Sequence, residues 1–146
     1  MAGNRFKASA SAITTGTSAK TLFQVIAASN HKVRIDRISL TFNGTSNTAE
    51  PILCRLIRQT TSGTMTGVTG KKDPDDWSET IQTTFSKDAS AEPTTGEVID
   101  EVYAHPQVGY IWPFPKGLYI GGGDRLGVVV TAAASVSASV TVDGEE

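Results

Sequence analysis

The sequence predicts an all-β fold, an antiparallel β-sandwich or jelly roll of about eight strands in a single domain. In several segments apolar and polar residues alternate with a period of two, as in strands with one buried and one solvated face. Gly, Pro, Asn and Asp separate these segments at roughly even spacing, and no segment has a helical period of useful length. A chain of 146 residues is long enough for one domain around one core.

The chain begins with a segment that we expect to be an N-terminal arm, residues 1–18, followed by the jelly-roll domain, residues 19–146. The arm is rich in small residues and carries Arg5, Phe6 and Lys7 near its beginning. Such a segment has little apolar surface to offset the entropy of ordering, so we expect it to be flexible in the free protein. We hypothesise that it orders on assembly, with Phe6 as an anchor and the two cations contacting acids of a partner or of a neighbouring copy.

The next strands are predicted at 21–27 and 32–42. Within the second, the apolar residues change from odd to even positions at Asp36–Arg37. Because a one-residue slip sends side chains to the opposite face, this change predicts a β-bulge or a crossing between sheets. A turn is predicted at Asn43–Gly44, and the strand 52–58, apolar on both faces, is expected in a central position.

The second half of the chain contains one strand of strict alternation, 136–142. Another strand is predicted at 124–131, and the small residues between the two suggest a closing hairpin. The segment 73–79 opens with proline and acids, which predicts a long connection with one helical turn. Weaker strand signals lie at 80–86, 97–105, 109–112 and 116–120.

Residue types that catalysis requires are sparse, and we expect neither an enzyme nor a bound cofactor. The two histidines, His31 and His105, have no partner at a spacing that zinc sites use, so no metal site is predicted there. Cys54 is the single cysteine, and no nucleophile-elbow motif is present.

The densest acidic cluster lies in the segment 73–79 and consists of Asp73, Asp75, Asp76 and Glu79. Carboxylates of this kind are ligands for calcium, but their order does not match an EF-hand loop. A solvated loop is favoured, and calcium binding stays open.

Charge is distributed unevenly along the chain, although the net charge is only −2. Residues 1–58 contain eight Lys or Arg against two acids, whereas residues 59–146 contain five against thirteen. Either the two halves compensate within the folded monomer, or they form a two-signed surface for docking onto a partner or another copy. The basic strands lack interleaved aromatic rings, so nucleic-acid binding is not expected. Neither a secretory signal nor an apolar stretch long enough for a membrane span is seen, and we expect a soluble protein with no membrane contact.

The aromatic residues Tyr103, Tyr110, Trp112, Phe114 and Tyr119 allow two interpretations. Rings of this kind most often fill the core of a sandwich. Alternatively, several of them form one contiguous, concave platform for a sugar or a protein.

The order of short motifs resembles that of the jelly-roll virion proteins of tailed bacteriophages, especially the head decoration or capsid cement family. The motifs are TLFQV (21–25), NHKV (30–33), ISLTFNGTS (38–46), EPILCRLIRQTTSGT (50–64), AEPTT (91–95) and GGGDRLGV (121–128). The stretch 63–87 does not align with this pattern.

The resemblance implies a homotrimer on the exterior of the virion capsid, made in the host cytoplasm, that clamps neighbouring subunits of the major capsid protein without covalent bonds. Its expected partners are therefore the major capsid protein and other copies of itself. The alternative function is a carbohydrate- or receptor-binding module of a phage tail, fibre or adhesin, because jelly rolls serve both purposes. Exposure of the five aromatic rings distinguishes the two functions.

Overall fold

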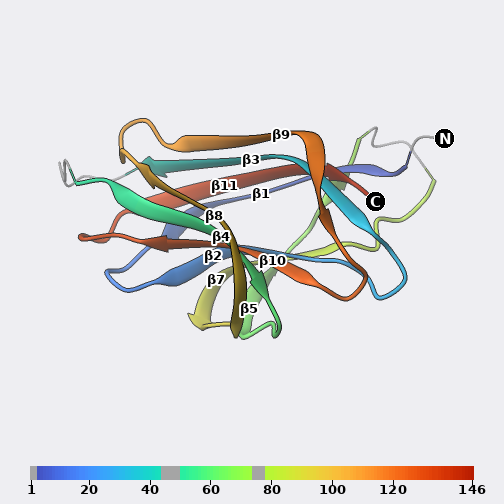
Figure 1. The fold of residues 1–146 in the computed structure, drawn as a ribbon, viewed down its shortest axis with the longest axis horizontal. Helices are drawn as coiled ribbons and strands as arrows, with labels where there is room; N and C mark the ends of the chain where they lie inside the picture. The colour runs from blue at the N-terminus through green and yellow to red at the C-terminus, as the bar shows by residue number, and fades with distance from the viewer. Residues whose placement is uncertain (1–2, 44–49, 74–77) are drawn as a thin grey trace.

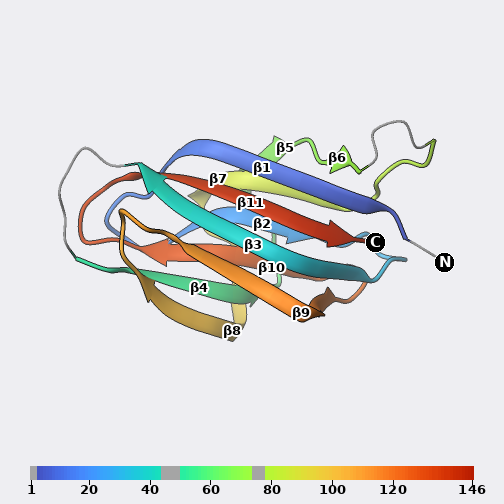
Figure 2. The same cartoon turned by 90° about the horizontal axis from the view of Figure 1, so that it is seen from above.

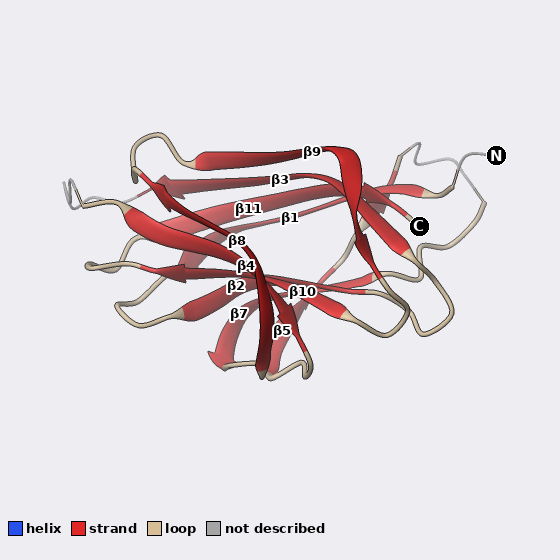
Figure 3. Cartoon of the chain, in the orientation of Figure 1, coloured by secondary structure: helices blue, strands red, loops and turns tan. Residues whose placement is uncertain are grey.

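A computed structural model of the chain describes residues 3–43, 50–73 and 78–146. In this part of the chain eleven strands form two antiparallel sheets that pack face to face, and no helix is present (Figures 1 and 3). The all-β sandwich prediction is confirmed. The strands are β1 (Arg5–Thr14), β2 (Lys20–Ile26), β3 (Val33–Asn43), β4 (Ile52–Gln59), β5 (Thr64–Val68), β6 (Lys71–Lys72), β7 (Thr84–Ala91), β8 (Thr95–Ala104), β9 (Tyr110–Ile120), β10 (Arg125–Thr131) and β11 (Ser137–Glu145).

The strand order is that of a jelly roll. Sheet A has the order β6-β1-β11-β3-β9, and sheet B has the order β5-β7-β2-β10-β4-β8. Eight of the strands, β1 to β4 and β8 to β11, form the jelly roll. Each of them up to β10 is followed by a strand of the other sheet, except β4, which is followed by β8 and pairs with it in sheet B. Figure 2 shows sheet A lying across sheet B, with β5, β6 and β7 as an insertion between β4 and β8.

Residues 5–14, which the sequence suggested as a flexible arm, form β1 inside sheet A. This strand pairs with β11 from Arg5↔Glu145 to Thr14↔Ser137. Phe6 is only 1% exposed and belongs to the core. The expectation of a flexible arm is therefore wrong for these residues. In β1 small side chains alternate with polar ones, and small residues suit a strand that packs closely beside another strand.

The predicted bulge in β3 is confirmed. The register of β3 shifts against β9 between Ile35 and Arg37, and the register of β11 against β3 shifts at Asp143/Gly144. Ile35 and Ile38 are both fully buried although they have opposite phase. The bulge thus keeps the apolar residues of both halves of β3 on the core.

The predicted closing hairpin of β10 and β11 is wrong. β10 lies between β2 and β4 in sheet B, whereas β11 lies between β1 and β3 in sheet A. The connection begins at Ala132 and ends at Val136, and both side chains are buried in the core. The chain therefore crosses the end of the core instead of turning back along one sheet.

Other predicted elements differ in their limits. The signals at 109–112 and 116–120 belong to one strand, β9, and the strand expected at 80–86 begins at Thr84 as β7. Most of the segment 73–79, where a helical turn is predicted, lies outside the described residues. Gly44 of the turn predicted at Asn43–Gly44 also lies outside them.

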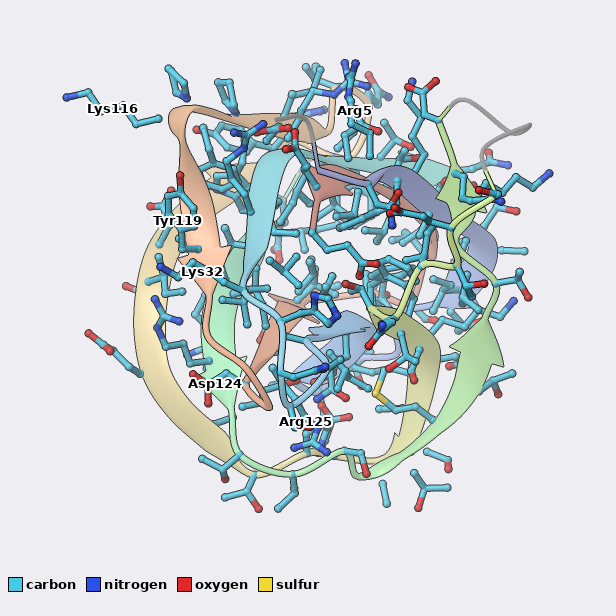
Figure 4. The ribbon with its side chains drawn as sticks, turned by 90° about the vertical axis from the view of Figure 1, so that its right-hand side faces the viewer. Arg5, Lys32, Lys116, Tyr119, Asp124 and Arg125 are labelled. Carbon is cyan, nitrogen blue, oxygen red and sulfur yellow. The ribbon has the colours of Figure 1, made fainter. Side chains whose placement is uncertain are left out.

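Sheet B is strongly curved because its connections are short. β7 and β8 are four strand spacings apart in the sheet order, about 19 Å if the sheet were flat. Residues 92–94, which join them, reach only about 14 Å when fully extended. The ends of the sheet must therefore approach each other, and Figure 4 shows the two connections closing the ring below β2 and β10.

We call this feature the wrapping ribbon: β4 and β5 with residues 60–63, paired with β7 and β8 with residues 92–94. Its two connections are held together by Thr60 N–H donating to Thr94 O (2.9 Å) and Thr94 N–H donating to Thr61 Oγ1 (2.8 Å). One end of the ribbon pairs with β10 through β4, and the other pairs with β2 through β7. The ribbon thereby covers the outer face of the two central strands.

Beneath the ribbon lies a buried polar network. Gln24 Nε2 donates to Gln59 Oε1 (2.7 Å), and Gln59 Nε2 donates to Thr21 Oγ1 (2.9 Å). Glu92 Oε1 accepts from both the backbone N–H (2.6 Å) and the hydroxyl (3.0 Å) of Thr21, which ties the ribbon to β2. Because buried polar groups are costly when unpaired, this network holds the ribbon in one position.

We expect Gly127→Ala to destabilise the protein by about 1–3 kcal/mol, because the added Cβ would overlap the buried carboxamide of Gln59. Gly67→Ala is the matched control, since its Cβ meets nothing within 4 Å. The free energy of unfolding in urea checks both variants. Equal stability of the two variants would contradict a packed network at this position.

Candidate protein interface

One side of the sandwich is open, because it is bounded by two edge strands, β8 of sheet B and β9 of sheet A. The two strands are joined by residues 105–109 and run along the same side of the molecule (Figure 2). We call this region the β8–β9 side. The opposite side is bounded by β1 and β6 of sheet A and by β5 and β7 of sheet B.

The exposed large apolar side chains of the described residues are concentrated on the β8–β9 side. All of them lie between positions 98 and 119: Val98, Tyr103, Val108, Ile111 and Tyr119. Tyr103 is 74% exposed and Val108 79%. Exposed apolar groups scattered singly need no explanation, but their restriction to one side indicates a contact surface.

The five aromatic residues named from the sequence are divided between core and surface. Trp112 is 2% exposed, and the ring of Tyr110 packs edge-on against it with centroids 5.0 Å apart. Phe114 is partly buried against the core. Tyr103 and Tyr119 are exposed, but they lie on different sheets. The rings therefore do not form one contiguous aromatic platform.

The edge of β9 is blocked in its middle. Pro113 pairs with Arg37, but the next pair is Leu118 with Ile35, so residues 114–117 bulge out of the sheet. Gly117 has φ +76°, which suits a residue without Cβ. Pro115 and Lys116 lie in this stretch and Pro113 directly precedes it, and prolines lack the N–H that another strand would need.

The edge of β8 has a different chemistry. It carries Glu97, Asp100 and Glu101 and neither Lys nor Arg. Its pairing with β4 is regular from Asp100 to Ala104, whereas the register shifts on the N-terminal side of Asp100. The Arg58 Nε and Glu97 Oε2 atoms are 3.9 Å apart on an exposed surface, so this ion pair contributes little to stability.

The outer face of sheet A beside β9 carries a compact set of ion pairs. Arg34 donates from Nε to Asp36 Oδ1 (2.9 Å) and from Nη2 to Glu145 Oε2 (2.9 Å), and the hydrogen bond to Asp36 raises the pKa of Arg34 above its ordinary value. Lys32 Nζ lies 5.6 Å from the ring centre of Tyr119. Figure 4 shows the two side chains near each other at the end of the sandwich. Charges here are thus largely satisfied within the chain.

The assembly residues named from the sequence lie on the opposite side from β8 and β9. Phe6 packs against Phe85, with ring centres 5.2 Å apart, so it anchors its own core and is not available to a partner. Arg5 and Lys7 alternate with it and are exposed. Of the three residues expected to contact a partner, only Arg5 and Lys7 are accessible.

Within the described residues no group of three His, Cys, Asp or Glu is arranged to hold a metal ion. Two of the four acids of the candidate calcium loop, Asp75 and Asp76, lie outside the described part. A hollow of about 580 Å³ lies between residues 68–72 and 80–84, and Lys71 and Lys72 are the charged residues among those that line it. In the same described residues there is no helix long and apolar enough to cross a membrane.

Sequence reasoning named Tyr103 and Tyr119 as surface candidates but missed Val98, Val108 and Ile111. The strand pattern did not reveal that β8 and β9, which carry Val98 and Ile111, lie at edges, and Val108 lies in the turn between them. Comparisons with known families, curated proteins and solved structures found no match. The β8–β9 side must therefore be interpreted from its own chemistry.

Behind β8, the thiol of Cys54 is buried, and burial raises its pKa from 9.0 to about 12. The thiol therefore stays neutral in the folded protein while the unfolded chain ionises above about pH 9. We expect the free energy of unfolding to fall as pH rises from 9 towards 12, by up to about 1.4 kcal/mol per pH unit from this group. Urea unfolding across this pH range checks the slope, and Cys54→Ala should lack this contribution. Identical slopes for the two proteins would contradict the raised pKa.

Proposed function

We propose that this chain is a structural protein of a tailed-phage virion that decorates the outer surface of the capsid and stabilises it by clamping major capsid subunits. The observation that carries the proposal is the concentration of exposed apolar side chains along one open side of the sandwich. A surface of this kind suits contact with another protein. The order of sequence motifs resembling capsid cement proteins supports the same function.

Clamping by such a protein requires no chemistry beyond surface burial. Anything that binds only the folded, assembled state stabilises it by mass action, so each decorated site resists expansion or dissociation of the shell. The proposed arrangement on the capsid is a homotrimer at positions where several capsid subunits meet, with the chain's own copies as additional partners.

A carbohydrate- or receptor-binding module is the second candidate, favoured by the exposure of Tyr103 and Tyr119. Sugar-binding surfaces commonly use such rings. The burial of Trp112 and the separation of the two tyrosines on different sheets favour the decoration function over this alternative.

The decisive experiment is an electron-microscopy reconstruction of phage particles that carry the chain and of particles that lack it. We expect density to be missing from the capsid exterior in the second set. Density missing from a tail or fibre instead would overturn the decoration function and support the receptor-binding module.

The two exposed cations of β1 provide a second test. We expect Arg5→Glu combined with Lys7→Glu to weaken binding to undecorated capsids by about tenfold at low salt. The two side chains are exposed but lie opposite Glu145 and Asp143 of β11, so the folding stability should fall by only about 1–2 kcal/mol. Phe6→Ala serves as the contrast, since loss of this buried ring should cost about 3–5 kcal/mol of folding stability. Sedimentation with capsids and urea unfolding measure the two effects. Unchanged capsid binding by the charge-reversed protein would remove Arg5 and Lys7 from the contact.

A further inference from the structure

Edge strands of soluble proteins carry devices that prevent another strand from pairing with them, such as shortness, lysine, proline or a bulge. In the described part of this chain, β6 has two residues, both lysine, and β5 has five residues with a register shift. β9 has two prolines, Lys116 and a bulge. β1 is covered by β6 only at Phe6 and Lys7, and its remaining edge has a bulge between Ala10 and Ile13, with Ala12 at φ +58°. These edges are therefore protected.

The remaining edge, β8, lacks these devices between Asp100 and Ala104. It contains no proline or lysine, and its pairing with β4 is regular over these five residues. The N–H of Glu101 donates to Asp100 Oδ1 (2.8 Å) on an exposed surface. This N–H thus points away from β4, and because the direction repeats every second residue, so does the N–H of Tyr103.

The side chains of this edge define what would fit against it. Glu101 and Tyr103 project from the outer face of sheet B and are both exposed. On an added strand, one side chain would lie beside the carboxylate of Glu101, and the side chain two residues away would lie beside the ring of Tyr103. A basic residue and an apolar residue at these positions would complement the edge.

We propose that residues 100–104 of β8 are a docking edge for an extended, basic segment of another protein, which joins sheet B as an additional strand. Backbone hydrogen bonds give such a contact its affinity, and the alternating side chains give it selectivity. Charge complementarity selects the occupant, because β8 carries three acids and no base. Antiparallel pairing of this segment with that of a second copy would set Glu101 opposite Tyr103 and leave the carboxylate without a cation, which a basic segment would supply.

This inference rests on the proposed function in one respect: on the virion, the basic segment would belong to a capsid subunit. The docking edge itself is testable without phage. The probe is a synthetic peptide of about seven residues in which lysine alternates with valine, long enough to cover the regular part of β8. Glutamate–valine and backbone N-methylated lysine–valine peptides are the control probes.

Titration of the intact protein, followed by NMR and by amide hydrogen exchange, measures the contact. We expect saturable binding of the lysine peptide, weakened by salt, with slower exchange of the outward N–H groups at Glu101 and Tyr103. Neither control peptide should bind comparably. Binding of the N-methylated peptide with equal affinity, or exchange unchanged along β8, would overturn strand addition.

Variants at exposed positions separate backbone pairing from charge alone. Tyr103→Pro removes an outward N–H without removing a bond to β4, and we expect it to weaken peptide binding about tenfold more than Tyr103→Ala, which keeps that N–H. Glu101→Lys should weaken binding more than Glu97→Lys, an equal change of charge outside the regular segment. Equal effects within each pair would reduce the contact to non-specific attraction and overturn the proposal.

Two further outcomes identify other occupants. Slow exchange at Glu101 and Tyr103 in the free protein that increases with protein concentration would show that a second copy occupies the edge, contrary to the proposal. In the second outcome, the Tyr103→Pro variant loses peptide binding and still decorates capsids normally. That result would exclude β8 as the capsid contact and overturn the capsid segment as the occupant, while leaving the decoration function intact.

Discussion

The structure depends on the shortness of the two connections that carry the wrapping ribbon across sheet B. Three residues, 92–94, cannot span four strand spacings of a flat sheet, so the sheet curls and brings together the ends of β7 and β8 that these residues join. That curvature places a polar layer between the ribbon and the central strands, where Gln24 and Gln59 bond each other. It also fixes where β8 begins, because Thr94 is hydrogen-bonded to Thr60 and Thr61 of the neighbouring connection.

The polar layer and the exposed edge are therefore parts of one arrangement. Most sandwiches expose the outer face of each sheet to solvent, but here the outer face of β2 and β10 is covered by the ribbon. The hydrogen bonds of this network restrain the ribbon, because a shift would break the Gln24–Gln59 and Gln59–Thr21 bonds, although Gln24 Oε1 has no hydrogen-bond partner. β8 consequently presents its acidic edge in a fixed position, which suits recognition of an extended partner with little loss of conformational freedom.

Local sequence pattern predicted most strand positions and one irregularity, but not the partners of the strands. The change of phase at Asp36–Arg37 was readable because apolar residues record which face is buried. The crossing of the chain at residues 132–136 and the inclusion of residues 5–14 in sheet A were missed, because alternation is the same in a hairpin and in strands of different sheets. The ribbon was equally unreadable, since Gln59 and Gly127 meet only through the tertiary fold. For the same reason the sequence named two exposed tyrosines without revealing the edge they flank.

The uneven charge along the chain is explained partly by compensation and partly by separation. Ion pairs join bases of the first half to acids of the second, as in Lys20–Asp88, Arg34–Glu145 and Arg37–Asp143. The charges outside ion pairs include Asp100 and Glu101 of β8 and the cations Arg5 and Lys7 of β1, on opposite sides of the sandwich. Because exposed charges are screened within about 10 Å at moderate salt, each side acts on its own neighbours. One domain can therefore meet a basic partner on one side and an acidic partner on the other, which is the property that a protein bridging subunits requires.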